Sequence, residues 1–488
     1  MQFDKAMCKA ARRGFLHVMQ WLHEKYLPEG NVRGATNEAV KNGDLHMIEW
    51  LHAHYPQDLC DPTVLETAAG SGAMHVLQWF STHRRGEWNA LITFMRPLTA
   101  AAAHGKLETL RWLHATANRR LYSALIDSAA ANGHVHVMQW LQAHGLSGGG
   151  SHAAMDNAAR NGHLDAVRWL HEHYRKQGCT TRAMDGAAAN GHLRIVMWLH
   201  ANRDEGCSTD AMDLAATNGH FGVLQWLHAN RNEDCSRQSL VGAASNGHLA
   251  ILQWLHDQRY TTSFHLEAEL SNRRTTSGPP ILVTDVMDNA AANGFLDVVE
   301  WLHATFPHDG CTVRAIDVAA SNGHLHVVEW LHEHRAEGCT TNAMDDAAAH
   351  GHLRIVQWLH ANRNEGCTTK AMDAAARDGH LEVVQWLHLN RSEGCTTEAM
   401  DASAMRGHTK IFRFLHEHRR EGCTVNAATQ AAAHGRFEIL AFLYAHHREA
   451  VDLVEDQDSR YTCSRVHILK WLGKVADTMT FNNAMVQT

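Results

Sequence analysis

Histidine is the residue type in this sequence with the widest range of possible chemistry, because 41 of the 488 residues are histidines. Imidazole binds transition metals and changes its charge near neutral pH. About half of the histidines occupy two recurring positions, one in the motif Trp-Leu-His, as at His171 and His200, and one directly after a glycine. The second group comprises His134, His163, His192, His220, His248, His324, His352, His380 and His408.

The spacing of these histidines does not predict a metal site. Zinc needs ligand nitrogens about 2.0–2.1 Å from one ion, and equivalent histidines one repeat apart are too distant. Pairs such as His171 and His173 point to different sides of a helix, and no HExxH or paired CxxC motif occurs. We therefore expect hydrogen bonds to turn and inter-repeat backbone groups, with no metal and no cofactor. A pH-responsive role and adventitious metal binding are the alternatives.

Cysteine is confined to one recurring position in the same way. Nine of the eleven cysteines lie nineteen residues before a recurring Trp or Phe, and they are Cys60, Cys179, Cys207, Cys235, Cys311, Cys339, Cys367, Cys395 and Cys423. Neighbours in this series are expected about 10 Å apart, whereas a disulfide requires Cα atoms within about 7 Å. We interpret them as small apolar packing residues; a redox or metal-binding role is the alternative.

No motif for catalysis, nucleic-acid binding or membrane insertion is present. The sequence lacks GxSxG and a phosphate-binding glycine loop, and a residue repeated fifteen times is usually structural, so we predict that the protein is not an enzyme. The net charge of −8 gives no indication of nucleic-acid binding. No apolar run reaches the roughly 18–20 residues of a membrane span, and the start lacks the apolar block of a signal peptide. We expect an intracellular location, cytoplasmic or nuclear.

The recurring Trp of Trp-Leu-His defines the unit that positions all these residues. It returns every 28 or 29 residues in most steps, with longer steps of 33 residues after Trp79 and 47 residues after Trp254. Sixteen copies are recognisable, at Trp21, Trp50, Trp79, Trp112, Trp140, Trp169, Trp198, Trp226, Trp254, Trp301, Trp330, Trp358, Trp386, Phe414, Phe442 and Trp471. The chain is therefore one tandem array.

Each unit is predicted to contain two helices. In one unit, Thr180 or Thr181 is a suitable N-cap for the first helix, and Asn190-Gly191 is a stop signal. The second helix follows in 192–203 and is apolar nearly all round, including Trp198, so it should be buried on most sides. One unit cannot bury this surface alone, whereas a stack can. The fold class is therefore all-α, a solenoid of tandem helix–turn–helix repeats, forming a curved rod about 150 Å long at 8–10 Å between packed helices.

The segment AAANGHLRIVMWLH at 187–200 resembles the core of an ankyrin repeat. The resemblance covers 1–445, about fifteen repeats with a loop insertion at 257–286; a degenerate last repeat and a C-terminal cap or tail occupy 446–488. The usual T-P-L-H opening is replaced by x-A-M-D, and the unit is four to five residues short, which indicates a short-hairpin variant. The resemblance implies a monomeric, non-enzymatic scaffold or adaptor that binds protein partners. The chain begins inside a first helix, which suggests an incomplete gene model or a missing upstream domain.

Positions that vary within this constant framework are the candidates for partner binding. Sixteen residues before each Trp or Phe, the chain has Arg182, Asp210, Gln238, Arg314, Asn342, Lys370, Glu398 and Asn426. Variable positions four and seven residues later share the same helical face. A near-constant aspartate lies between them, and we include Asp185, Asp213, Asp317, Asp345 and Asp373 in the candidate site.

Other interpretations of this face and of the whole chain stay open. The variable face could be drifting freely, and the aspartates could stabilise their own helix N-termini. A histidine-rich structural or pH- or metal-responsive solenoid is the alternative function. The repeat part of a larger enzyme, whose catalytic domain is missing from this chain, is another.

Overall fold

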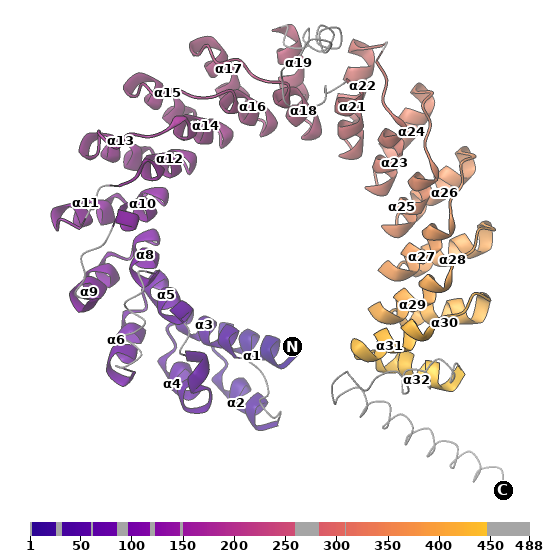
Figure 1. Ribbon diagram of the computed structural model, residues 1–488, viewed down its shortest axis with the longest axis horizontal. Coiled ribbons are helices and arrows are strands. Elements are labelled where there is room, and N and C mark those ends of the chain that lie inside the picture. Colours follow the sequence, from indigo (N-terminus) through magenta and orange to yellow (C-terminus); the bar gives the residue numbers. More distant parts are fainter. Residues whose placement is uncertain are drawn as a thin grey trace. The chain divides into compact units, whose positions relative to one another are not determined.

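A computed structural model describes residues 2–25, 32–59, 62–84, 96–117, 123–146, 150–258, 283–307 and 309–446 (Figure 1). Within these ranges the fold consists of α-helices and one short 3-10 helix, Pro56–Leu59, without any strand. The predicted all-α solenoid of helix pairs is confirmed. The insertion at 257–286 and the C-terminal segment 446–488 lie almost wholly outside the described residues, so their predicted roles remain predictions.

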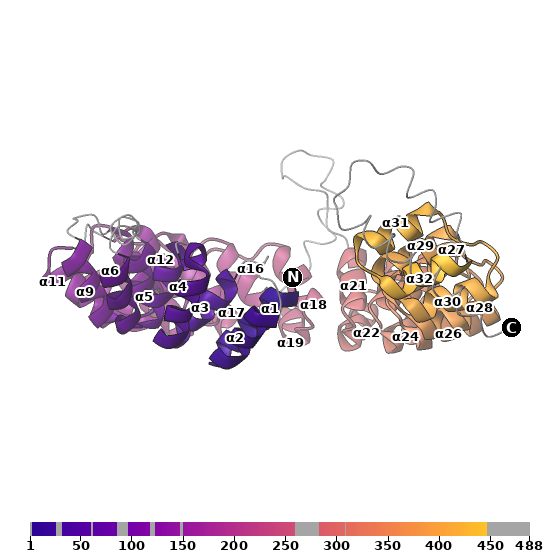
Figure 2. The ribbon, with the colours of Figure 1, turned by 90° about the horizontal axis from the view of Figure 1, so that it is seen from below.

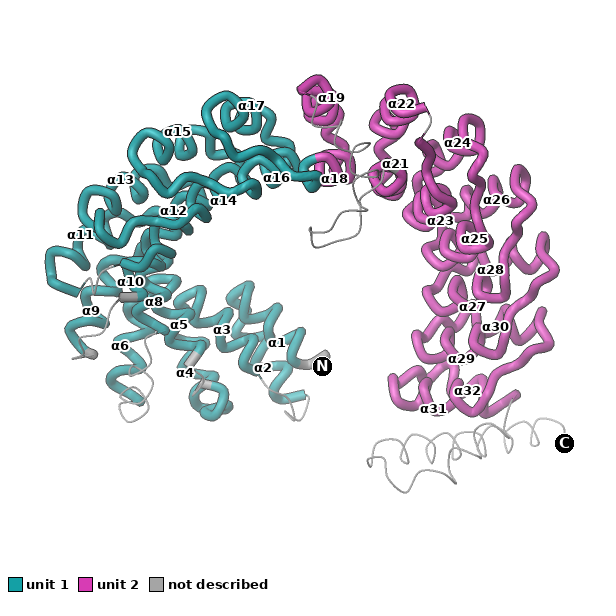
Figure 3. Tube along the Cα trace, turned by 45° about the horizontal axis from the view of Figure 1, so that its top comes forward, with its two compact units in different colours: residues 1–239 teal, residues 240–488 magenta. Residues whose placement is uncertain are grey.

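Contacts divide the chain into two units, residues 1–239 and 240–488, and the boundary falls within helix α18 (Figure 3). In unit 1 the first helices of the repeats are α1 (Gln2–Arg12), α3 (Arg33–Asn42), α5 (Pro62–Ser71), α8 (Arg96–Ala103), α10 (Ser123–Ala131), α12 (His152–Arg160), α14 (Thr181–Ala189) and α16 (Asp210–Thr217). The second helices are α2 (Leu16–Lys25), α4 (Leu45–His54), α6 (Met74–His83), α9 (Leu107–Ala117), α11 (Val135–Ala143), α13 (Leu164–His173), α15 (Leu193–Asn202) and α17 (Phe221–Asn230).

Unit 2 has the same alternation of helices. Its first helices are α18 (Gln238–Ser245), α21 (Val283–Ala292), α23 (Val313–Ser321), α25 (Thr341–Ala349), α27 (Thr369–Asp378), α29 (Thr397–Arg406) and α31 (Val425–Ala433). Its second helices are α19 (Leu249–Asp257), α22 (Leu296–Thr305), α24 (Leu325–His334), α26 (Leu353–Asn362), α28 (Leu381–Asn390), α30 (Thr409–His418) and α32 (Phe437–His446). Within each unit, first helices form one row and second helices another (Figures 1 and 2).

The predicted start and stop signals of the helices are confirmed. Thr180 is the N-cap of α14, and its hydroxyl accepts a hydrogen bond from the Arg182 amide at 3.2 Å. Gly191 ends the helix with a φ of 74°, a left-handed conformation that glycine adopts without steric cost. The amide of His192 then donates to the Ala187 carbonyl, which directs the chain into α15.

The core lies between the rows and between successive repeats. Ala187 and Ala188 are fully buried, so the first helices of adjacent repeats approach closely, as α12 and α14 do. Leucine and β-branched residues of the second helices complete the core. The prediction that the recurring Trp is buried is wrong for most copies. Trp169 is only 6% exposed, whereas Trp358 is half-buried and Trp21 is 50% exposed.

Candidate functional site

The first of the variable positions is exposed in every repeat for which it was predicted. Each of these residues is one of the first two residues of its first helix, and the Ala that follows it is buried wherever the repeat keeps that Ala. In unit 1 the exposed residues are Arg182, Asp210 and Gln238, and in unit 2 they are Arg314, Asn342, Lys370, Glu398 and Asn426.

The other two variable positions are only partly available. Leu214, Asp346 and Arg377 are exposed, whereas Gly186 and Ala402 are buried. A Cβ added to Gly186 would lie 3.0 Å from the Cβ of Arg160 in the preceding repeat, which explains this burial. Helical spacing predicted that all three variable positions share one exposed face. The exposed surface is narrower, because the second and third positions are buried in some repeats.

The structure places the five candidate aspartates inside the array, and not on this face. Asp185, Asp213, Asp317, Asp345 and Asp373 are 4–9% exposed. Each carboxylate holds the loop of the next repeat. Asp345, for example, accepts the amide of Thr368 at 2.7 Å with one oxygen and the Thr368 hydroxyl at 2.7 Å with the other. These aspartates cannot be direct partner-binding residues, and this part of the prediction is corrected.

The same contact caps the first helix of the next repeat. The Thr368 hydroxyl, which donates to Asp345, accepts the Lys370 amide at 3.2 Å and so satisfies a free donor at the start of α27. We call this arrangement the Asp–Thr clamp; Ser replaces Thr at Ser208 and Ser236. Burial raises the pKa of Asp213, and the hydrogen bonds from Ser236 oppose that shift. The expected stabilisation of a helix N-terminus is therefore present, but the helix belongs to the following repeat.

The histidines that follow glycine are inter-repeat contacts, as expected. His134 Nε2 donates to the Ala103 carbonyl of the preceding repeat at 3.1 Å. The imidazole of His192 lies over Gly162, where an added Cβ would come within 2.8 Å of the ring. Desolvation lowers the pKa of His134 and of His163. The ring at this position therefore fits between the turns of two successive repeats.

The second histidine position leads to a contact that the sequence pattern did not predict. The His332 ring packs against the edge of Trp358 in the next repeat, with ring centroids 5.2 Å apart. Its Nδ1 accepts from Arg363 Nη1 at 3.3 Å, and Arg363 also pairs with Glu365. The signal in the sequence is an Arg-x-Glu motif that returns in six repeats.

The glutamate of this motif also binds the preceding repeat. Glu205 accepts the backbone amide of Cys179 at 3.2 Å. Burial alone would raise the pKa of Glu205, but hydrogen bonds from Arg203 and from backbone amides outweigh burial and lower it to about 2. Arginine, glutamate and histidine thus form a second polar connection between repeats.

The cysteines beside this connection are packing residues. All nine described cysteines are free thiols, and six of them are buried. Burial raises the pKa of Cys179 to about 12 and that of Cys339 to about 11, so neither is a thiolate near neutral pH. Among the residues described by the structure, no three His, Cys, Asp or Glu side chains converge as a metal site would require.

Comparison with known families identifies the array. Models described as ankyrin repeats match residues 98–185, 184–228 and, in overlapping segments, 287–416. This chain belongs to the ankyrin repeat family. Ankyrin repeats generally serve as protein–protein interaction modules, and ankyrin repeat proteins are typically non-catalytic.

Other comparisons add no functional information about this ankyrin array. No curated protein matches the chain. A solved structure, the pentatricopeptide repeat protein PPR10 from maize, aligns with 93% of this chain and 74% of its own length, at 12% identity and a TM-score of 0.28. A TM-score this low carries no argument. Among the described helices of this ankyrin protein, none is long and apolar enough to cross a membrane.

Family membership gives the x-A-M-D motif of these ankyrin repeats a physical meaning. The alanine and methionine are buried, and the aspartate forms the Asp–Thr clamp on the next repeat. Five of the eight repeats have A-M-D after the variable residue, and in these five the three residues of the motif are buried while the residue before them is exposed.

Proposed function

We propose that this ankyrin array is a non-enzymatic scaffold that binds protein partners through the exposed first-helix positions. The supporting observation is the contrast between neighbours on one helix. Arg182 and its seven equivalents are exposed and vary in charge and size, whereas the aspartate three residues later is buried and nearly constant. Variable exposed residues on a rigid framework can recognise a partner without changing the fold.

The test starts from capture of partners by the full chain, followed by mass spectrometry. The triple variant Arg314→Ala, Lys370→Ala and Glu398→Ala then removes three exposed side chains from the proposed surface of unit 2. Stability should change by about 0.5 kcal/mol or less per site, because these are surface positions. Affinity for the captured partner should fall by at least about tenfold, because a few residues usually dominate an interface.

A matched control exists on the opposite row. Arg354→Ala, Glu382→Ala and Lys410→Ala remove one Arg, one Glu and one Lys from exposed positions on the second helices α26, α28 and α30. This variant should bind like the unchanged protein. The proposal would be refuted if the control lost binding while the first-helix variant, and similar combinations along the first helices, kept it. The interface would then lie on the second-helix row.

A further inference from the structure

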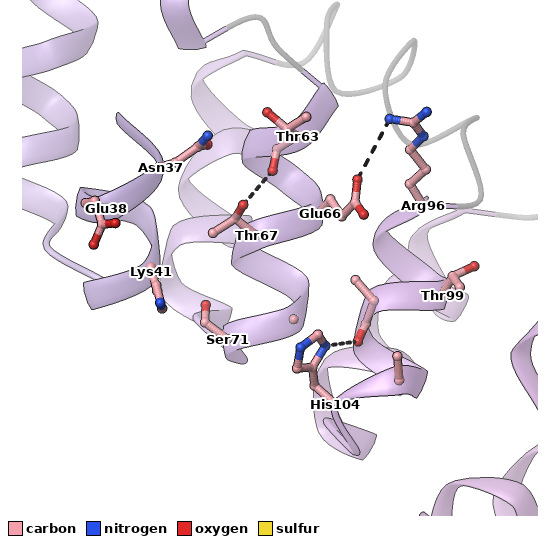
Figure 4. Close-up of a pocket in the computed structure, with 13 residues that line it drawn as sticks. Asn37, Glu38, Lys41, Thr63, Glu66, Thr67, Ser71, Arg96, Thr99 and His104 are labelled. Atoms are coloured by element: carbon pink, nitrogen blue, oxygen red, sulfur yellow. Dashed lines mark hydrogen bonds and ion pairs between the residues drawn. The ribbon is translucent and has the colours of Figure 1, made fainter. Parts of the chain in front are cut away.

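A groove crosses three successive first helices near the start of unit 1. It has a volume of about 870 Å³ and is lined from α3, α5 and α8 (Figure 4). Many of its lining residues, including Lys41, Thr67 and Arg96, occupy the variable positions of these repeats. The groove therefore belongs to the first-helix surface, and a role for it in binding rests on the function proposed for that surface.

The three repeats that line the groove have no aspartate at the position of the Asp–Thr clamp. The clamp position holds Asn37, Glu66 and Thr99 in place of aspartate, and all three line the groove. Glu66 points to Arg96, 4.0 Å away (Figure 4). Gly70 and Ala103 lie where longer side chains occur in other repeats, so these two residues leave the space between the helices open.

Among the described residues that line the groove, Lys41 carries a positive charge that is not paired with an acidic side chain. Glu38 pairs with Arg12 at 3.1 Å, and Glu66 pairs with Arg96, so each of these carboxylates has an arginine beside it. The ammonium group of Lys41 is exposed, and no ion pair joins it to an acidic side chain within the described ranges. A ligand with a carboxylate at this point would form a charge-assisted hydrogen bond.

The length of the groove fits an extended peptide. Three first helices at about 10 Å spacing span about 20 Å, which corresponds to about six residues at about 3.3 Å each. Lining hydroxyl and imidazole groups supply polar contacts along this path. Thr67 donates to the Thr63 carbonyl, and His104 Nδ1 donates to the Ala100 carbonyl, which leaves other polar valences of both side chains available (Figure 4).

We propose that this groove binds an extended acidic peptide segment of a protein partner, with a carboxylate side chain on Lys41. Attraction between the two charges decreases with salt, because the site is open to solvent.

The experiment uses the full chain and a fluorescein-labelled peptide of four Glu-Ala repeats, with a peptide of four Lys-Ala repeats as the opposite-charge probe. Fluorescence anisotropy at low salt should show saturable binding of the acidic probe and at least about tenfold weaker binding of the basic probe. Lys41→Glu should weaken the acidic probe by about tenfold or more. Thr67→Phe should also weaken it, because the ring fills the groove.

Two matched variants separate the groove from general effects. Lys410→Glu makes the same charge change at an exposed second-helix position in unit 2, outside the proposed binding surface. Thr217→Phe replaces a threonine that, like Thr67, donates to the carbonyl four residues earlier, but on α16. Both should bind the acidic probe like the unchanged chain, and thermal melts should show that all four variants are folded.

Equal losses with Lys41→Glu and Lys410→Glu, or no loss with Lys41→Glu, would overturn the groove proposal. So would equal binding of the acidic and basic probes. None of these results would affect the partner test with Arg314, Lys370 and Glu398, because that readout uses a captured protein and residues outside the groove. Failure of the groove and failure of the proposed function are therefore distinguishable.

Discussion

Removing one Asp–Thr clamp should weaken the array at a single junction. In Asp345→Ala, the amide and the hydroxyl of Thr368 both lose an acceptor at 2.7 Å. Hydrogen bonds to charged groups contribute about 1.5–3 kcal/mol each. Thr368 is half-buried, so water can replace part of this loss, and Asp345 itself no longer has to be buried. We expect the free energy of unfolding to fall by about 2–4 kcal/mol.

Two variants of Thr368 calibrate this estimate. Thr368→Ala removes an N-cap as well as one clamp hydrogen bond and should cost about 1–2 kcal/mol. Thr368→Ser should cost about 0.5 kcal/mol or less, because Ser208 and Ser236 make the same two contacts to Asp185 and Asp213. The double variant Asp345→Ala/Thr368→Ala should be less destabilised than the sum of the singles by about 1 kcal/mol, since the two side chains share one interaction.

The assay combines urea unfolding with amide hydrogen exchange. Stability in a repeat array is a sum of repeat and interface contributions, so the effect should be local. Amides of α27 should exchange faster in Asp345→Ala, whereas those of α31, two repeats further on, should keep their rates. A loss below about 0.5 kcal/mol, or strictly additive single variants, would refute the view that the clamp connects adjacent repeats.

Three further predictions concern other framework residues. Desolvation lowers the pKa of His352, which faces His350 and His380, so its contribution to stability is present above the unfolded value of about 6.5 and is lost as pH falls below it. The melting temperature should therefore fall as the pH is lowered from 7.5 to 5.5. Phe295 occupies the equivalent position in another repeat, so His352→Phe should make the melting temperature depend less on pH. An unchanged pH dependence in this variant would contradict this reasoning. Trp169→Ala should cost about 3–5 kcal/mol in urea unfolding, and Trp358→Ala clearly less because that ring is half-buried; equal losses would show that exposure does not set the cost. Cys179 and Cys395, with pKa values raised to about 12, should react with iodoacetamide at pH 8 far more slowly in the folded than in the urea-unfolded protein, and equal rates measured by mass spectrometry would show that they are accessible.

The helices could be predicted from the sequence because their signals are local. A Thr or Ser before many of the first helices and a glycine after them act within a few residues, through hydrogen bonds and a left-handed φ that need no distant partner. The apolar pattern of the second helix also follows from its own periodicity. Because the same local pattern returns in every repeat, the sequence also predicts a solenoid. Comparison of the repeats with one another then identifies the eight exposed variable residues.

The role of a polar side chain depended on its neighbour in space. Asp210 and Asp213 are both acidic and lie one turn apart on α16, yet Asp210 is exposed, whereas Asp213 is 6% exposed. Helical spacing placed them on the same face. Ser236, in the loop of the next repeat, donates hydrogen bonds to both carboxylate oxygens of Asp213.

Sequence by itself therefore determined the helices, their order and the face on which variation occurs. Tertiary structure alone decided which residues of that face remain exposed, because desolvation depends on the atoms of the following repeat. It also decided that Glu38 and Glu66 are neutralised by Arg12 and Arg96 while Lys41 is not, since an ion pair needs two side chains within about 4 Å. Residues 26 or 30 positions apart in the sequence meet at that distance only when successive repeats stack.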